Sequence, residues 1–200
     1  MLNKVRPIVE ELLKFLNLDK IPVQPNTITL LAFVASACVP LLAILGVHPY
    51  IIAMVLLASA SLDVLDGYVA RKRRLQTSYG AFLDSTLDRV SDAMYTLALA
   101  LTGIVDFAFA YTLLTCEYLV SYTRARAETL GVSLAGVGLM ERGERTLFKF
   151  MCLIAAPTII LVAKILAFLL LVLTAVTAAQ RIWTTKRALE GAYPAATGRL

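Results

Sequence analysis

Four aspartates in the first half of the chain form two pairs whose spacing indicates chemistry. Asp63 and Asp66 would share one face of a helix, and Asp84 and Asp88 would share one face of the next. The short connection over residues 72–79 would fold the two helices into a hairpin, so that the acidic faces meet. Because carboxylates beside long apolar runs are expensive to place, the default interpretation is a functional site.

Four carboxylates held together repel one another, and a bound cation removes that repulsion. Hard oxygen ligands suit Mg²⁺, Mn²⁺ or Ca²⁺ better than Zn²⁺. Gly67 and Gly80 leave space on the same helix faces, and a basic run follows at residues 71–74. Metal, space and positive charge together predict a phosphate-bearing ligand and a metal-assisted displacement. The predicted ligands of one or two Mg²⁺ or Mn²⁺ ions are Asp63, Asp66, Asp84 and Asp88.

The pattern D-x2-D-G-x2-A-R-x8-G-x3-D-x3-D resembles the signature of the CDP-alcohol phosphotransferase family. All eight positions are present, as Asp63, Asp66, Gly67, Ala70, Arg71, Gly80, Asp84 and Asp88. The resemblance implies an integral membrane enzyme, usually a homodimer. Such an enzyme moves a phosphatidyl-type group from a CDP-linked lipid to an alcohol and releases CMP.

The resemblance also implies which residues bind the CDP-lipid. The family often has a Pro-Asn-x-x-Thr segment near the nucleotide, which matches Asn26 and Thr29 here, although Asn26 could equally be a helix cap. The predicted CDP-lipid set is Asp63, Asp66, Gly67, Ala70, Arg71, Gly80, Asn26 and Thr29. Asp88 is the candidate catalytic residue, either as the base for the acceptor hydroxyl or as the group that orients it.

The composition predicts an all-α integral membrane protein built as one domain over residues 1–200. Of the 200 residues, 59% are hydrophobic and only 16% are charged. We expect six transmembrane helices over about residues 26–184, with a turn near Pro157 and Lys164 between the last two. Residues 1–19 predict an amphipathic interfacial helix before these spans, and 185–200 a cytoplasmic tail.

The net charge of +5 is distributed unevenly, which argues for membrane orientation and against nucleic-acid binding. Basic residues gather in the N-terminal segment and around 71–74, 124–145 and 186–187, on the same side of the predicted spans. We therefore expect a multi-pass protein of the cell membrane whose two termini and active site face the cytoplasm.

A second cluster of chemistry-bearing residues lies at the end of the fourth span and the start of the fifth. Guanidinium groups facing a cavity there would bind an oxyanion in bidentate fashion. The alternative is that these arginines hold helix ends at the headgroup level or pair with Glu128, Glu141 and Glu144. The predicted acceptor-phosphate residues are Ser121, Arg124, Arg142 and Arg145, and either of the last two could face the cavity.

Arginines beside the aspartates favour an acceptor that carries its own phosphate. The segments at 121–128 and 141–145 resemble the branch of the family that makes phosphatidylinositol phosphate or archaetidylinositol phosphate from inositol phosphate. The glycerol-phosphate branch is the alternative, but its usual Arg-Glu-Phe-type sequence is replaced here by Arg126-Ala127-Glu128. A divalent-cation transporter is the alternative from another class, although the arginine cluster would have no use in a cation path.

Overall fold

The computed structural model describes residues 23–192, and over that range it consists of helices and connections without a strand. The helices are α2 (Pro25–Ile44), α3 (Pro49–Lys72), α4 (Ser78–Leu101), α5 (Phe107–Thr129), α6 (Arg142–Ala155) and α7 (Ile160–Ala192). The expected all-α class is thereby confirmed. The interfacial helix predicted over 1–19 lies outside the described residues.

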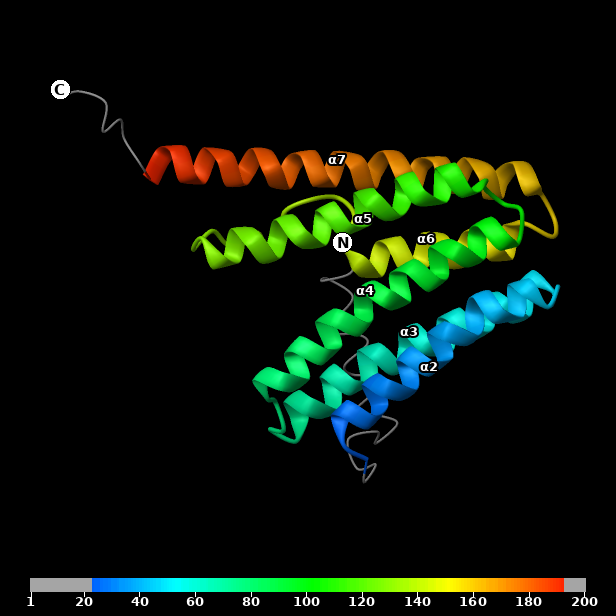
Figure 1. Cartoon of the computed structure of the whole chain (residues 1–200), viewed down its shortest axis with the longest axis horizontal. Coiled ribbons are helices and arrows are strands. Elements are labelled where there is room, and N and C mark those ends of the chain that lie inside the picture. Colours follow the sequence, from blue (N-terminus) through cyan, green and yellow to red (C-terminus); the bar gives the residue numbers. More distant parts are fainter. Residues whose placement is uncertain (1–22, 193–200) are drawn as a thin grey trace.

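Successive helices run in opposite directions and form a layered bundle (Figure 1). The hairpin of α2 and α3 packs beside α4, α6 lies against α3 and α7, and α5 packs along α7. The α2–α3, α4–α5 and α6–α7 turns gather at one end of the bundle, on the right of Figure 1. The α3–α4 connection lies at the opposite end, which places the acidic parts of α3 and α4 next to each other.

Side-chain hydrogen bonds between helices hold α2, α3 and α4 in register. Ser59 of α3 donates to the carbonyl oxygen of Ala32 in α2 over 2.6 Å, and Tyr95 of α4 donates to the Ser59 hydroxyl over 2.8 Å. Ser91 of α4 donates to the Ser36 hydroxyl of α2 over 2.9 Å. These buried bonds fix the spacing of the helices that carry the aspartates.

Both ends of the α3–α4 connection are defined by local chemistry. Thr77 caps α4 by accepting a hydrogen bond from the backbone N–H of Gly80 over 3.0 Å. Arg74, with φ of 56°, adopts the left-handed conformation in which Gly46 and Gly103 end α2 and α4. The N–H groups of Arg74 and Leu75 return to carbonyls of the last turn of α3, so the connection is short and ordered.

Three sequence predictions need correction at the level of helix ends. Asn26 does not cap α2, because the helix begins at Pro25 and Gln24 holds the capping position. Lys164 lies inside α7, and the turn before that helix covers residues 156–159. The helix α7 continues to Ala192, so the part of the predicted tail before residue 193 is helical.

Three of the described helices, α2, α3 and α7, are long and apolar enough to cross a membrane. Their outer faces expose large apolar side chains, such as Leu31 in α2, Met54 in α3 and Phe168 in α7. Such faces match hydrocarbon rather than water. By contrast, α6 has only 14 residues and α4 carries several charged residues within its length. The sequence and the fold together describe a membrane protein.

Candidate active site

The α3–α4 hairpin brings Asp63, Asp84 and Asp88 together, as their spacing predicts. Each offers a carboxylate oxygen, and the three oxygens lie within 4.8 Å of one another. Asp84 and Asp88 stand one helical turn apart on α4, and Asp63 faces them from α3. All three side chains are half-buried. Three hard oxygen donors at this separation fit a divalent cation such as Mg²⁺ or Mn²⁺.

Asp66 does not belong to this set of three and instead lines a smaller neighbouring cavity. It is 4% exposed, and its Oδ2 has no hydrogen-bond partner among the residues that the structure describes. A buried carboxylate oxygen without a partner is costly unless a ligand or ion satisfies it. This oxygen therefore also fits a site for a cation or for a cation-bound ligand.

The smaller cavity has a volume of about 180 Å³ and is lined by seven of the eight residues predicted to bind the CDP-lipid. The eighth, Asp63, does not line it and lies instead with Asp84 and Asp88. A side chain at Gly80 would crowd it, since a Cβ there would lie 3.0 Å from Asn26 Oδ1 and from Thr77 Oγ1. Gln76 and Thr77 also line the cavity, although the sequence patterns had not singled them out. The predicted residues on its wall are Asn26, Thr29, Asp66, Gly67, Ala70, Arg71 and Gly80, with Asp84 at the edge shared with the larger cavity.

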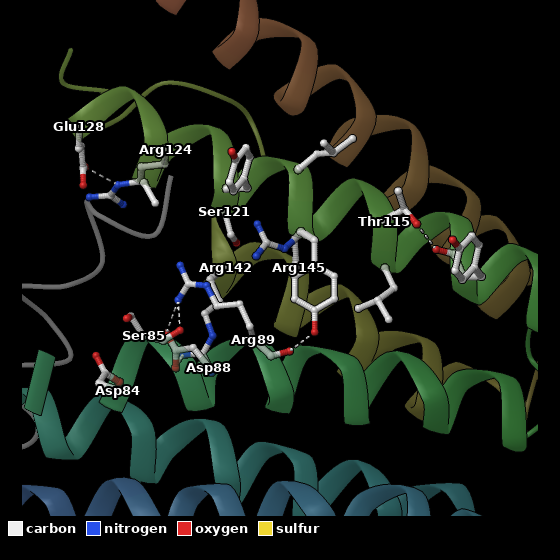
Figure 2. Close-up of a pocket in the computed structure, with 16 residues that line it drawn as sticks. Asp84, Ser85, Asp88, Arg89, Thr115, Ser121, Arg124, Glu128, Arg142 and Arg145 are labelled. Atoms are coloured by element: carbon white, nitrogen blue, oxygen red, sulfur yellow. Dashed lines mark hydrogen bonds and ion pairs between the residues drawn. The ribbon is translucent and has the colours of Figure 1, made fainter. Parts of the chain in front are cut away.

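A larger cavity of about 1090 Å³ opens on the other side of Asp84 and Asp88. Its wall combines α4, α5 and α6, as Figure 2 shows. Three tyrosines, Tyr111, Tyr118 and Tyr122, line its α5 side. All four residues predicted to bind the acceptor phosphate line it as well, namely Ser121, Arg124, Arg142 and Arg145.

The two arginines of α6 occupy different surroundings. Arg142 points from α6 toward the aspartates (Figure 2), and its Nη1 contacts Asp63 and lies 2.7 Å from Asp88 Oδ1. Arg145 is 2% exposed, with its Nη2 3.2 Å from Asp92 Oδ2 and its Nε 3.4 Å from a Glu117 oxygen. Arg142 is therefore the more accessible guanidinium at the junction of the cavity and the aspartates.

Arg124 forms an ion pair with Glu128, one turn along α5, at 2.9 Å between Nε and Oε1. This pairing is one of those named in the alternative interpretation of the arginines, but both residues also lie on the cavity wall. Both side chains are close to half exposed. An exposed helical pair of this kind is weak, so the guanidinium of Arg124 remains available to an anion in the cavity.

A buried set of charges behind the cavity includes residues that the motif analysis did not assign. Lys149 of α6 is fully buried, and its Nζ lies 2.8 Å from a Glu117 oxygen and 3.0 Å from the backbone oxygen of Asp92. Thr96 donates to Glu117 over 3.1 Å. The sequence did contain one signal for these residues: Asp92, Glu117 and Lys149 are charged residues within predicted membrane spans, and such residues are candidates for a functional role.

Comparison with known proteins assigns the family. The family model for CDP-alcohol phosphatidyltransferase matches residues 23–185, which includes all six described helices up to the last turns of α7. The chain belongs to the CDP-alcohol phosphatidyltransferase family. It is therefore an enzyme of the transferase class, and the match spans both cavities and the aspartates between them.

Curated relatives extend the similarity over nearly the whole chain. An archaetidylinositol phosphate synthase from Pyrococcus horikoshii is 34% identical over 198 residues, covering 95% of this chain and 99% of the relative. A phosphatidylinositol phosphate synthase from Corynebacterium glutamicum is 33% identical over 151 residues, covering 69% and 65%.

Solved structures agree with the fold. A phosphatidylinositol phosphate synthase from Mycobacterium tuberculosis with CDP-DAG bound matches with a TM-score of 0.71 and 28% identity, covering 98% of both chains. The same protein in complex with manganese and citrate matches with a TM-score of 0.71, covering 98% of this chain and 93% of that one. The manganese complex agrees with the chemistry of the carboxylate donors described above.

Proposed function

We propose that this protein transfers a phosphatidyl-type group from a CDP-linked lipid to a hydroxyl of inositol phosphate and releases CMP. The observation that carries the proposal is the junction of two cavities at Asp84. The smaller cavity has two glycines on its wall that leave space for a nucleotide, and four arginines line the larger one, Arg89 being the fourth beside the three predicted. A donor in the first and an anionic acceptor in the second would meet at the carboxylates.

The carboxylates would hold the divalent metal ions of the reaction. The oxygens of Asp63, Asp84 and Asp88 lie within 4.8 Å of one another, and Asp66 lines the smaller cavity beside them. When bound, Mg²⁺ or Mn²⁺ would neutralise charge on the pyrophosphate and on the departing CMP. All four aspartates are therefore retained as proposed ligands for one or two ions.

Asp88 is the proposed catalytic residue, because among the three converging carboxylates it is the one that lines the larger cavity and not the smaller one. The acceptor hydroxyl oxygen would attack the phosphorus next to the lipid and form a new P–O ester bond. The bond between that phosphorus and the bridging oxygen would break, and CMP would leave with this oxygen. Asp88 would take the hydroxyl proton or orient the hydroxyl for attack.

The arginines support a phosphorylated acceptor over a neutral alcohol. Arg124, Arg142 and Arg145 line the larger cavity together with Ser121, and guanidinium forks suit phosphate oxygens. The names of the curated relatives favour inositol phosphate over glycerol phosphate as this acceptor. In the smaller cavity, Asn26, Thr29, Gly67, Ala70, Arg71 and Gly80 are the proposed CDP-lipid contacts.

At the level of the whole protein, we propose one membrane domain in which all six helices cross the bilayer. Two features support this arrangement: successive helices run in opposite directions, and the basic segments of the chain gather at one end of the bundle. The cavities would then open near the cytoplasmic face, where a soluble acceptor meets the lipid. A homodimer is the expected assembly from the family resemblance.

The test is CMP release by the full chain, purified in detergent with a CDP-linked lipid and Mg²⁺ or Mn²⁺. Inositol phosphate, glycerol phosphate, serine and free inositol are offered in parallel. We expect release only with inositol phosphate. Release with glycerol phosphate instead would keep the aspartate chemistry and overturn the acceptor assignment. A divalent-cation flux in liposomes without nucleotide, and no CMP with any acceptor, would favour a transporter and overturn the proposal.

A further inference from the structure

The guanidinium of Arg142 sits among the carboxylates that would bind metal. Its Nη1 contacts Asp63 and lies 2.7 Å from Asp88 Oδ1, and Figure 2 shows the side chain reaching from α6 toward Asp88. These are two of the three carboxylates whose oxygens converge. Arg142 thus supplies the positive charge that offsets the repulsion between the carboxylates.

A divalent ion that bridges Asp63 and Asp88 would need the space between these carboxylates that Nη1 of Arg142 occupies. Mg²⁺ ligands lie at about 2.0–2.1 Å, so an ion bound by Asp63 and Asp88 would lie in contact with Nη1 of Arg142. The two cations would also repel each other strongly in a half-buried site. Metal binding therefore requires Nη1 of Arg142 to move away from Asp63 and Asp88.

Asp92 is an alternative ion-pair partner for the displaced guanidinium of Arg142. It lies one helical turn beyond Asp88, and its Oδ1 is 3.5 Å from Arg142 Nε. Both of these atoms are buried and lack a hydrogen-bond partner among the described residues. A small shift of Arg142 would therefore complete a hydrogen bond that is already nearly formed.

Asp92 is itself held in position by the buried charges behind it. Arg145 Nη2 lies 3.2 Å from Asp92 Oδ2, and Lys149 donates to the Asp92 backbone oxygen over 3.0 Å. Because these contacts hold the Asp92 carboxylate in place, its other oxygen, Oδ1, also keeps a fixed position. In that position, Arg142 would still line the larger cavity but would no longer be neutralised by Asp63 and Asp88.

We propose that Arg142 is an internal counter-cation of the aspartate site, which a divalent ion must displace and which then becomes available to an oxyanion in the larger cavity. The inference rests on the proposed metal site. Its consequence is a positive thermodynamic coupling: metal binding raises the affinity for an oxyanion, and the oxyanion raises the affinity for metal by the same factor. Metal loading would therefore prepare the acceptor side of the reaction.

The test measures Mn²⁺ affinity by isothermal titration calorimetry on the full chain in detergent, without substrate. Arg142→Gln removes the competing charge while keeping a polar, unbranched side chain. We expect this variant to bind Mn²⁺ at least ~10-fold more tightly than the native protein. Sulfate, compared with chloride at equal ionic strength, should tighten Mn²⁺ binding to the native protein by ~5-fold or more, and this effect should vanish in Arg142→Gln.

Arg124→Gln is the matched control, because it removes the same charge from the same cavity but from an arginine paired with Glu128. Its Mn²⁺ affinity should stay within ~2-fold of native. This result would show that the tighter binding in Arg142→Gln comes from removing the displaced guanidinium and not from losing any one positive charge near the cavity. Arg142→Lys keeps the charge and should bind Mn²⁺ less tightly than Arg142→Gln. It also provides a second variant if Arg142→Gln fails to fold.

The outcomes distinguish this inference from the function on which it rests. Equal or weaker Mn²⁺ binding by Arg142→Gln, or a sulfate effect that persists in it, would overturn the counter-cation role and leave the metal site standing. If the native protein does not bind Mn²⁺, both the metal site and the inference fail. Because sulfate is the probe, a wrong choice of acceptor does not affect the test.

Discussion

Charged residues around the active site are shared between partners rather than arranged in separate pairs. Asp92 lies between Arg142 and Arg145, and Glu117 lies between Arg145 and Lys149. Removing one member would leave an uncompensated charge in an apolar surrounding, which costs far more than the pair gains. The set therefore fixes side-chain positions at the cavity wall more than it stabilises the fold.

Asp88→Asn tests the chemistry at the residue scale. We expect CMP release to fall ~10²-fold or more, because an amide cannot take the hydroxyl proton. Binding of the CDP-linked lipid should be retained, since Asp88 lines the larger cavity and not the smaller one. The measurements are CMP release under saturating substrates and binding of the CDP-lipid to the purified variant.

Asp106→Asn is the control for this change. Asp106 caps α5 by accepting a hydrogen bond from Phe109 N–H over 2.7 Å, and asparagine caps a helix equally well. It should release CMP at the native rate. Native turnover in Asp88→Asn would remove Asp88 from the chemistry. Loss of both turnover and Mn²⁺ binding would trace the defect to the role of Asp88 as a metal ligand.

The motif residues could be predicted from sequence because their chemistry is local to two adjacent helices. The spacing of Asp84 and Asp88, and the hairpin that brings Asp63 to them, follow from helical periodicity alone. The position of Arg142 could not be predicted in this way. It depends on how α6 packs against α3 and α4 across many residues of intervening chain, and periodicity carries no information on that packing.

At the scale of elements, the connection between α5 and α6 is attached to α7. The N–H groups of Leu139 and Met140 donate to Thr177 Oγ1 over 3.1 and 3.0 Å. Arg181, which is buried, donates to the backbone oxygens of Val137 and Val120. Since α6 begins directly after this connection, its attachment to α7 fixes the position of the first turn of α6, which carries Arg142 and Arg145.

Gly138→Ala tests this attachment. Gly138 has φ of +111°, and a Cβ there would lie 2.3 Å from Thr177 Cγ2. The added methyl must displace Thr177 and with it the hydrogen bonds to Leu139 and Met140. We expect a lower thermal unfolding midpoint in detergent and weaker acceptor binding, because the start of α6 would shift.

Gly136→Ala is the matched control, since Gly136 also has positive φ, at +75°, but its added Cβ would meet no atom within 4 Å among the described residues beyond its two chain neighbours. Both variants carry the cost of a left-handed alanine, and only Gly138→Ala carries the overlap, which should add about 1–3 kcal/mol of destabilisation. Equal midpoints for the two variants would show that the contact with Thr177 does not matter.

Helix bodies were predicted well and helix ends less well, for a physical reason. The two ends of α4 coincide with Thr77 and Gly103, whose capping chemistry the sequence displays. The end of α7 carries no such signal. Residues 184–192 include five polar side chains yet remain helical, and polar composition alone does not end a helix.

At the scale of the whole molecule, the two ends of the bundle differ in charge. The end with the α3–α4 and α5–α6 connections holds the basic segments 71–74 and 124–145. The turns at the opposite end contain His48 and Asp106 but no arginine. The positive-inside rule predicts that the basic end, to which the aspartates lie nearer, faces the cytoplasm.

Labelling of single cysteines tests this orientation. In a background with Cys38, Cys116 and Cys152 replaced by serine, Ser133→Cys reports the basic end and His48→Cys reports the other, and both native residues are exposed. In sealed right-side-out vesicles, a membrane-impermeant maleimide should label His48→Cys and reach Ser133→Cys only after permeabilisation. The reverse pattern would place the cavities outside and overturn the expected orientation. Labelling of both sites in sealed vesicles would mean that the helices between residues 48 and 133 do not cross an odd number of times, against the six-span arrangement.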